Sequence, residues 1–101
     1  MCGICGIINF KNKAVDKNEI QKMMEIIKHR GPDDSGYFSN SNVGLGFVRL
    51  SILDLSMKGH QPMTDESDRY LITHNGEVYN FIEVRNDLIK KGYKFKSNTD
   101  T

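Results

Sequence analysis

The amino-acid sequence predicts a mixed α/β fold of the α+β kind, in which the sheet is mostly antiparallel. Residues 4–10 are apolar and rich in β-forming side chains, whereas apolar residues recur at helical spacing between 16 and 30. Residues 70–80 hold two β-rich runs around an Asn-Gly pair, which is typical of a local hairpin and hence of antiparallel pairing. A length of 101 residues fits one domain with a modest core.

The N-terminal part is expected to run from a strand into a helix. The run ICGIINF at 4–10 suits a strand with both faces covered. After the polar break at 11–15, Asp16 and Glu19 have the spacing of a capping box. The following helix has an apolar face made of Ile20, Met23, Met24 and Ile27. It is expected to end with Lys28, His29 and Arg30 in its last turn, Gly31 at C′ and Pro32 as the stop.

The middle of the chain predicts two strands and a long loop. The sequence DDSG at 33–36 is expected to begin a turn, and strands are expected at 36–39 and 43–53, on either side of the linker SNSN. Residues 56–69 are polar with Gly and Pro, which predicts a loop.

The last third predicts a hairpin, a helix and a short strand. Asn75-Gly76 is the pair favoured in type I′ turns, so YLITHNGEVYN at 70–80 is the clearest hairpin. Asn80 and Glu83 repeat the capping-box spacing before a second amphipathic helix with Phe81, Val84 and Leu88 on its apolar face, ending before Gly92. YKFKS at 93–97 is expected to form a strand. The chain contains no repeat and no interdomain linker.

Composition narrows the class of partner without naming one. With 14 Lys plus Arg, 13 Asp plus Glu and a net charge of +1, nothing indicates binding to nucleic acid or to a membrane surface. No apolar run approaches the roughly 18 residues of a membrane span, and no secretory signal is visible. The two cysteines are therefore expected to be reduced thiols in the cytoplasm.

The opening MCGICG allows three interpretations. The first is a C-x-x-C pair, but a structural zinc site needs a second pair of ligands, which the sequence lacks. A redox pair usually lies at a helix N-terminus, whereas these cysteines lead into a strand. Metal binding and redox activity are therefore disfavoured, and Cys5 is interpreted as a small buried hydrophobic residue. A Cys–His pair would need His29, His60 or His74, each of which has a simpler structural explanation.

The third interpretation makes Cys2 an N-terminal nucleophile. Removal of Met1 would leave a thiol next to a free α-amino group, whose ordinary pKa of about 7.7–8.0 lets it act as the base. Gly3 would then suit close approach of a substrate to the main chain. The three letters MCG alone do not decide among these interpretations.

A family resemblance favours the nucleophile. MCGICGI, HRGPDDSG, RLSILDLS, GHQPM, HNGEVYNF and SNTDT occur in the order and approximate spacing of one family. Over essentially all of residues 1–101, the sequence resembles the class II, N-terminal nucleophile glutamine amidotransferase domain of glutamine-hydrolysing asparagine synthetases. The resemblance implies part of a four-layer αββα sandwich, with L-glutamine as the small-molecule substrate.

The resemblance also implies a role for individual residues. Cys2 is the expected nucleophile, and the Asn75 side chain with the Gly76 N–H forms the expected oxyanion hole. Arg49 matches the arginine that binds the substrate α-carboxylate. Glu77 and Asp100 match the acidic residues that hold the α-ammonium, while Arg30 and DDSG are expected to shape the pocket. Main-chain groups of Leu50, Ser51, Ile52 and Leu53 are expected to contact glutamine.

The resemblance further implies partners outside this chain. Family domains of this kind are about twice as long and precede a synthetase domain that uses ATP, Mg²⁺ and aspartate, so the chain is expected to be the N-terminal portion of the glutaminase domain. No cofactor or metal is expected within these residues, and the isolated chain is expected to have unpaired sheet edges and little activity. The acceptor stays open between aspartate and a polysaccharide or secondary-metabolite substrate, as do a non-catalytic role and a homodimeric assembly.

Overall fold

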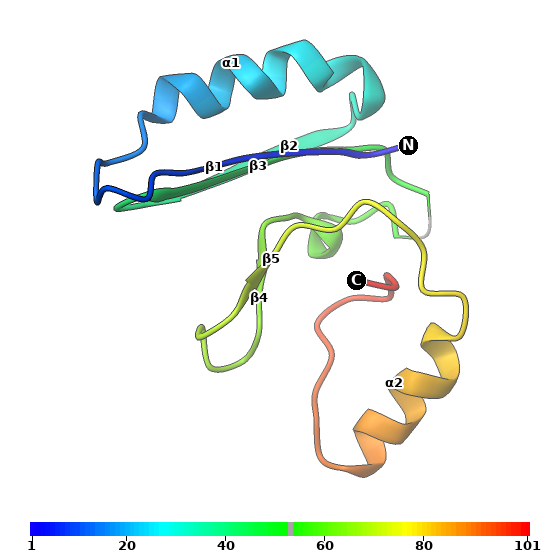
Figure 1. The fold of residues 1–101 in the computed structure, drawn as a ribbon. Coiled ribbons are helices and arrows are strands. Elements are labelled where there is room, and N and C mark those ends of the chain that lie inside the picture. Colours follow the sequence, from blue (N-terminus) through cyan, green and yellow to red (C-terminus); the bar gives the residue numbers. More distant parts are fainter. Residues whose placement is uncertain (53) are drawn as a thin grey trace.

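The chain folds into an α+β arrangement built on antiparallel pairing (Figure 1). The computed structural model describes residues 1–52 and 54–101. Strands β1 (Gly3–Ile8), β3 (Val43–Arg49) and β2 (Asp34–Asn40) form one sheet in the order β1-β3-β2. Strands β4 (Met63–Thr64) and β5 (Leu71–Ile72) form a second, two-stranded sheet. The predicted fold class and antiparallel pairing are therefore confirmed.

Helix α1 (Lys17–Ile27) lies across one face of the three-stranded sheet (Figure 1). Its predicted apolar face forms the core, because Ile20 and Met24 pack with Val15 of the preceding loop and Val48 of β3. Asp16 is the N-cap as predicted, but its carboxylate accepts from the Asn18 N–H rather than from that of Glu19. The capping-box geometry is thus only half correct.

The end of α1 differs from its prediction. A 3₁₀ turn, η1 (Lys28–Arg30), follows the helix, and Gly31 has φ −151° rather than a left-handed C′ conformation. A Cβ on Gly31 would lie 2.5 Å from the Arg49 nitrogen and 2.6 Å from its carbonyl carbon. Glycine is needed here because the chain crosses the end of β3 closely, which no analysis of the helix alone could indicate.

Strands β2 and β3 form the hairpin at the centre of the fold. The two-residue turn Ser41–Asn42 joins them, with Ser41 at φ 51°. The predicted turn at 33–36 is wrong, since β2 already begins at Asp34, and the predicted strand 43–53 ends at Arg49. Residues 50–52 instead leave the sheet, which frees their main-chain groups from strand pairing.

The predicted hairpin around Asn75-Gly76 is not formed. β5 pairs with β4, Met63 opposite Ile72, and the connection between them is organised by Asp65, whose carboxylate accepts the N–H groups of Arg69 (3.0 Å) and Tyr70 (3.1 Å). Hydrogen bonding, first from the Ser67 side chain, lowers the pKa of Asp65. The Asx-type turn at 65–70 therefore prevails over the Asn-Gly signal.

Helix α2 (Phe81–Lys90) stands apart from the sheet, close to the chain's C-terminus (Figure 1). Asn80 is its N-cap without a side-chain cap bond, so the second capping box is wrong. Its end is a Schellman motif, in which Tyr93 N–H donates to Leu88 O and Gly92, at φ 92°, donates to Ile89 O. Residues 93–97 form no strand, contrary to expectation.

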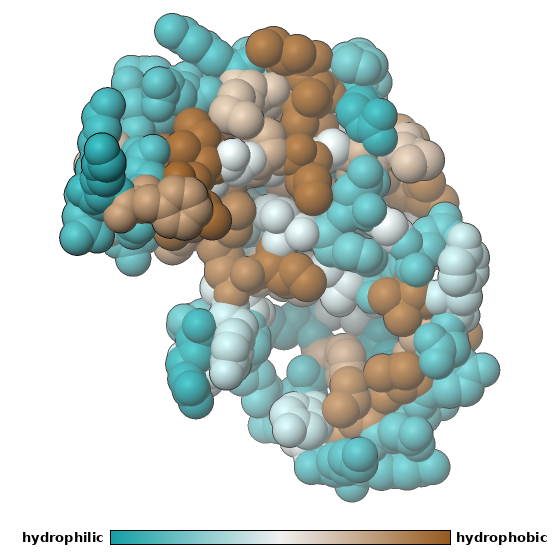
Figure 2. All heavy atoms as spheres, in the orientation of Figure 1, coloured by the Kyte–Doolittle hydropathy of each residue, from teal (hydrophilic) through white to brown (hydrophobic). Residues whose placement is uncertain are grey.

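Apolar side chains remain at the surface away from α1. Ile82 and Ile89 of α2 are 59% and 50% exposed, and Ile4 of β1 is 49% exposed. Figure 2 shows hydrophobic side chains exposed among polar ones, and a hollow between the β4–β5 hairpin and α2.

β1 and β2 are the outer strands of their sheet, each with one unpaired edge in the described chain. Neither α1 nor α2, the helices of the described ranges, combines the length and hydrophobicity that crossing a bilayer requires.

Because Gly31 crosses β3 closely, adding a methyl group at this position should destabilise the fold. Gly31→Ala should lower the free energy of unfolding by about 2 kcal/mol, because the added Cβ meets main-chain atoms that cannot rotate away. Chemical denaturation measures the loss. Gly92→Ala is the control, since nothing lies within 4 Å there and its cost comes from positive φ alone. A Gly31→Ala variant no less stable than Gly92→Ala would contradict the close crossing.

Candidate active site

A cavity of about 510 Å³ lies where the start of β1 meets the end of β3. Its walls come from chain segments that are far apart in sequence and are brought together only by the fold. Eight of the predicted site residues line it, namely Cys2, Arg49, Leu50, Ile52, Asn75, Gly76, Glu77 and Asp100. Ser51 is not among the lining residues, and Leu53 lies outside the described part of the chain. This cavity is therefore the candidate site.

Sheet pairing positions Cys2. Because β1 runs antiparallel to β3 with Gly3 opposite Val48, the residue before Gly3 lies next to Arg49 and Leu50. The Cys2 Sγ is 3.3 Å from the Leu50 nitrogen, which donates to it, and 3.6 Å from the Leu50 carbonyl oxygen. The Nε of Arg30 donates to the Cys2 carbonyl at 3.1 Å, so a side chain following α1 holds this end of the chain. Arg30 does not line the cavity itself, and its expected role in shaping the pocket stays a prediction.

Gly3 serves packing rather than substrate access. A Cβ there would lie 3.0 Å from Cγ2 of Val48 and 3.1 Å from Cδ1 of Ile27, on the side of the sheet that α1 covers. Gly3 is also not among the residues that line the cavity. The idea that Gly3 lets a substrate approach the main chain is therefore corrected.

The two cysteines have different surroundings. They lie three residues apart, so along an extended strand their side chains point to opposite faces, and both are free thiols. Cys5 packs against the core under α1, and burial raises the pKa of its thiol. Within the described ranges, no three His, Cys, Asp or Glu side chains come together as a metal site would require. Cys5 fits its predicted role as a small hydrophobe.

Arg49 is buried at the floor of the cavity, with 5% of its surface exposed. Its Nη1 donates to the Ser56 carbonyl at 2.7 Å, and its Nη2 donates to the Asp54 carbonyl. Gly59 packs against the guanidinium, since a Cβ there would lie 2.7 Å from its central carbon. These bonds to described residues use two of the five N–H donors of a guanidinium. Arg49 therefore stabilises the loop after β3 and also lines the cavity.

The segment after β3 is held by carboxylates. The Asp33 side chain accepts from the Ser51 N–H at 2.8 Å, which connects the DDSG sequence to the segment expected to contact glutamine. Asp54 accepts from the main chain of Ser56 at 2.8 Å and from that of Asn98 at 3.2 Å. Hydrogen bonding from the Ser56 hydroxyl, then from the Ser56 and Asn98 amides, with the charge of Arg49 assisting, lowers the pKa of Asp54 to about 2.

Residues 74–78 and 99–101 also line the cavity. Asn75, Gly76 and Glu77 adopt a non-strand conformation along the cavity, and Gly76 does not have positive φ. The Asp100 carboxylate accepts from the Val78 N–H at 2.8 Å, which brings Asp100 next to the segment that carries Glu77. The match of Asp100 rested on only five residues of sequence, and the fold does bring it to the same cavity.

The cavity also contains polar residues to which the sequence analysis gave no site role, among them Asp54, Gln61 and Thr101. His74, which was considered there as a base for Cys2 and set aside, lines the cavity as well. Gln61 is 5% exposed, and its amide contacts both the main chain of His74 and the hydroxyl of Thr101. A glutamine between His60 and Pro62 in GHQPM carries no local signal of burial. Its place within a matched motif was the only available indication.

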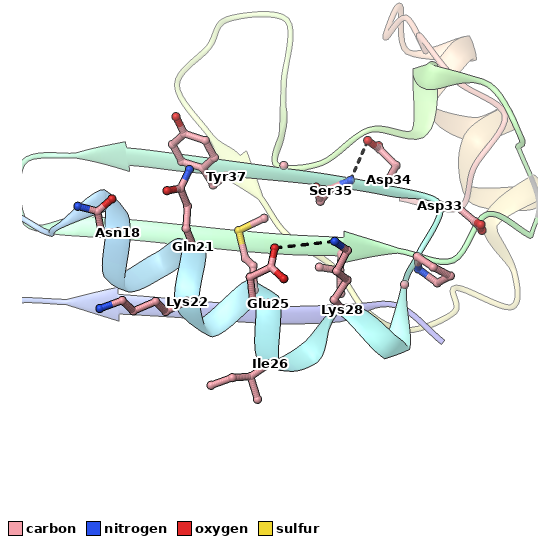
Figure 3. A pocket seen from close by; sticks show the side chains of 15 residues that line it. Asn18, Gln21, Lys22, Glu25, Ile26, Lys28, Asp33, Asp34, Ser35 and Tyr37 are labelled. Carbon is pink, nitrogen blue, oxygen red and sulfur yellow. Dashed lines mark hydrogen bonds and ion pairs between the residues drawn. The ribbon is translucent and has the colours of Figure 1, made fainter.

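A larger groove of about 1190 Å³ runs between α1 and β2 (Figure 3). Figure 3 shows polar and charged side chains along it, including Lys22, Glu25 and Lys28. The Glu25–Lys28 pair is 3.9 Å apart, and both side chains are mostly exposed. None of the residues predicted to be catalytic or to bind substrate lines this groove, so the cavity of about 510 Å³ is the candidate site. Residues 33–36, which were expected to shape the pocket, line this groove instead.

Comparisons with known proteins identify the family to which the chain is similar. The family of glutamine amidotransferase domains matches residues 1–101. The chain is 49% identical over 119 residues to a putative glutamine-hydrolysing asparagine synthetase 2 of Methanocaldococcus jannaschii, covering all of this chain and 22% of that protein. It is 47% identical over 104 residues to glutamine-hydrolysing asparagine synthetase 1 of Bacillus subtilis, covering 100% of this chain and 16% of that protein.

A third relative has a different name. The chain is 44% identical over 113 residues to the amidase chry2 of Gibberella zeae, covering 99% of this chain and 16% of that protein. The chain thus spans between 16% and 22% of the length of these curated relatives.

The hydrogen bonds to the Asp54 carboxylate predict how the stability of the protein depends on pH. Because folding lowers the pKa of this carboxylate from 3.8 to about 2, its stabilising effect is complete above pH 3.8 and is lost as the pH falls through 2. The NMR signals of the Ser56 and Asn98 amides should titrate together with a midpoint near pH 2. Asp54→Asn should abolish that titration and lower stability at pH 7. A midpoint near 3.8 for both amides would show that the bonds do not form.

Proposed function

Because the chain belongs to the glutamine amidotransferase domain family, we propose that it hydrolyses the side-chain amide of glutamine with Cys2 as the nucleophile. The observation that carries the proposal is the shared cavity. Cys2, Arg49, Asn75 and Asp100 line one space of about 510 Å³ although they come from four separate segments. A volume of this size exceeds that of a single amino acid and leaves room for water.

The proposed chemistry begins with removal of Met1. While Met1 is attached, the nitrogen of Cys2 is an amide and cannot accept a proton. Once freed, the α-amine takes the thiol proton as Sγ attacks the amide carbon of glutamine. The carbon–nitrogen bond then breaks, the amine returns the proton to the leaving group, and ammonia departs. Water hydrolyses the resulting thioester, which yields glutamate and restores the thiol.

The proposed oxyanion hole consists of the Asn75 side-chain amide and the Gly76 N–H. The tetrahedral intermediate carries a negative charge on the former carbonyl oxygen, and two fixed donors would stabilise it. Both residues line the cavity together with Cys2 and Arg49, which supports this role.

The amino-acid end of glutamine is proposed to bind between two charged groups. Arg49 uses two of its five N–H groups in the bonds to Asp54 and Ser56, and a guanidinium suits an α-carboxylate. Glu77 and Asp100, which line the same cavity, would bind the α-ammonium. Main-chain groups of residues 50–52 would complete the pocket, and Asp33 holds this segment in place by accepting the Ser51 N–H.

We further propose that these residues form part of a larger enzyme. The relatives named as asparagine synthetases support aspartate as the acceptor of the ammonia, and ATP with Mg²⁺ would act in a synthetase domain beyond residues 1–101. The antiparallel sheet with α1 on one face supports a part of an αββα sandwich. The similarity to amidase chry2 favours, as a second candidate, amide transfer to another acceptor. A cytoplasmic location and a homodimer stay predictions.

Replacing Cys2 tests the nucleophile. In the protein at its natural length, Cys2→Ala should abolish glutamine-dependent synthesis while synthesis from added ammonia continues, because only the source of ammonia is lost. Amide formation from each nitrogen donor is the measurement. Mass spectrometry of the active protein should find Cys2 at the N-terminus. Equal loss of both activities, or Met1 retained in the active enzyme, would sink the proposal.

Replacing Asn75 tests the oxyanion hole. Asn75→Ala should reduce kcat for glutamine hydrolysis by about 10²–10³, since one donor to the developing charge is removed. KM should change much less, because Asn75 is not proposed to bind the amino-acid end. Steady-state kinetics separate the two constants. Alkylation of Cys2 at the normal rate serves as the control for an intact nucleophile.

A further inference from the structure

The side chain of Gln61 connects two segments that carry proposed substrate-binding residues, 74–78 and 99–101. We propose that Gln61 is a positioning residue, which sets the location of the Asn75–Gly76 segment and of the Asp100 segment relative to Cys2. The inference rests on the proposed glutaminase function and adds a residue to which no role has been given. Gln61 itself is not proposed to touch the reacting atoms.

Gln61 is anchored firmly to the sheet. The main-chain carbonyl oxygen of Gln61 lies against Gly36 of β2, and a Cβ on residue 36 would collide with it. The two main chains can approach this closely only because residue 36 is glycine. The preceding residue adds a second anchor, because the His60 Nδ1 lies 2.7 Å from the Asp34 carboxylate at the start of β2. The main chain at 60–61 is therefore part of the rigid framework rather than of a free loop.

Both polar atoms of the Gln61 side-chain amide form hydrogen bonds. Its Oε1 accepts from the His74 N–H at 2.6 Å, and its Nε2 donates to the Thr101 Oγ1 at 3.4 Å. His74 directly precedes Asn75, and Thr101 directly follows Asp100. With 5% exposure, Gln61 leaves little room for water to replace these bonds. The amide accepts from one segment and donates to the other, so a single side chain holds both.

His74 completes the network. Its Nδ1 lies 3.4 Å from the same Thr101 hydroxyl, and its ring packs against Gly76, whose Cβ would lie 2.8 Å from Nε2. The ring therefore backs the proposed oxyanion donor, while Gln61 holds the main chain from which that ring extends. Displacing Gln61 would move Gly76 and Asp100 together without contacting Cys2, which is held by Leu50 and Arg30.

Substitutions at Gln61 and Thr101 test the two contacts. Gln61→Met keeps the length and removes both polar ends, so kcat for glutamine hydrolysis should fall about 10²-fold, as expected for misplaced reacting groups, and KM should rise. Gln61→Glu keeps the acceptor for His74, and the Thr101 hydroxyl can donate to its second oxygen, so kcat and KM should change less than in Gln61→Met. Thr101→Val removes the hydroxyl and leaves Gln61 unchanged, so KM should rise while kcat is largely retained, which covers the case that a Gln61 variant fails to fold.

The experiment uses the protein at its natural length, with kinetics in glutamine, ammonia-dependent synthesis, a thermal melt and the rate of Cys2 alkylation by iodoacetamide. Gln21→Met, on the exposed side of α1, is the matched control and should behave like the unsubstituted protein. The inference is supported if the glutamine constants change as described while alkylation and ammonia-dependent synthesis do not. It is overturned if Gln61→Met matches Gln21→Met, or if alkylation falls in parallel with kcat.

Failure of the proposed function gives a different result. In that case the unsubstituted protein releases no ammonia from glutamine, or Cys2→Ala is as active as the unsubstituted protein, before any Gln61 variant is compared. If Cys2→Ala is inactive and the Gln61 and Thr101 variants are normal, the function stands and the positioning role alone is wrong.

Discussion

The register between β1 and β3 is the constraint on which the rest of the site depends. With Gly3 opposite Val48, the first residues of the chain lie beside the last residues of β3, and the Cys2 sulfur reaches the main chain of Leu50. A slip of one residue would send every side chain of β1 to the other face of the sheet. Ile20 and Met24 of α1 pack on the face that Cys5 and Val48 share, so the core under α1 fixes this register. The hydrophobic core thereby determines where the nucleophile lies.

The other walls of the cavity depend on a different kind of interaction. The segments at 50–52, 54–61, 74–78 and 97–101 contain little regular structure, and single side chains connect them through main-chain groups. Asp33 binds Ser51, Asp54 binds Asn98, Asp100 binds Val78 and Gln61 binds His74. Each bond satisfies an N–H that no strand or helix pairs, which is why irregular chain can be held in place here. Such a wall leaves main-chain groups and charged ends available to a ligand.

Several charged groups therefore combine a structural role with a proposed chemical one. Arg49 donates to two main-chain carbonyls, Asp100 accepts from the Val78 N–H, and both residues line the cavity. A substitution at either position would disturb the loop as well as the ligand. The same holds for Asn75, whose location depends on the neighbouring His74 and, through it, on Gln61. Kinetic effects at these positions need a structural control for that reason.

The sequence by itself determined the elements whose signals are local. Apolar spacing identified α1 and α2, Asp16 indicated a helix start, and the ordered motifs indicated which residues belong to one site. The tertiary structure decided what depends on distant partners. Gly31 is glycine because β3 passes under it, residues 50–52 leave the sheet because Asp33 and Cys2 bind them, and the Asn75-Gly76 segment lines a cavity instead of turning a hairpin. Local periodicity reports hydrogen bonds within a few residues, whereas these features depend on contacts between segments tens of residues apart, which no window of sequence contains.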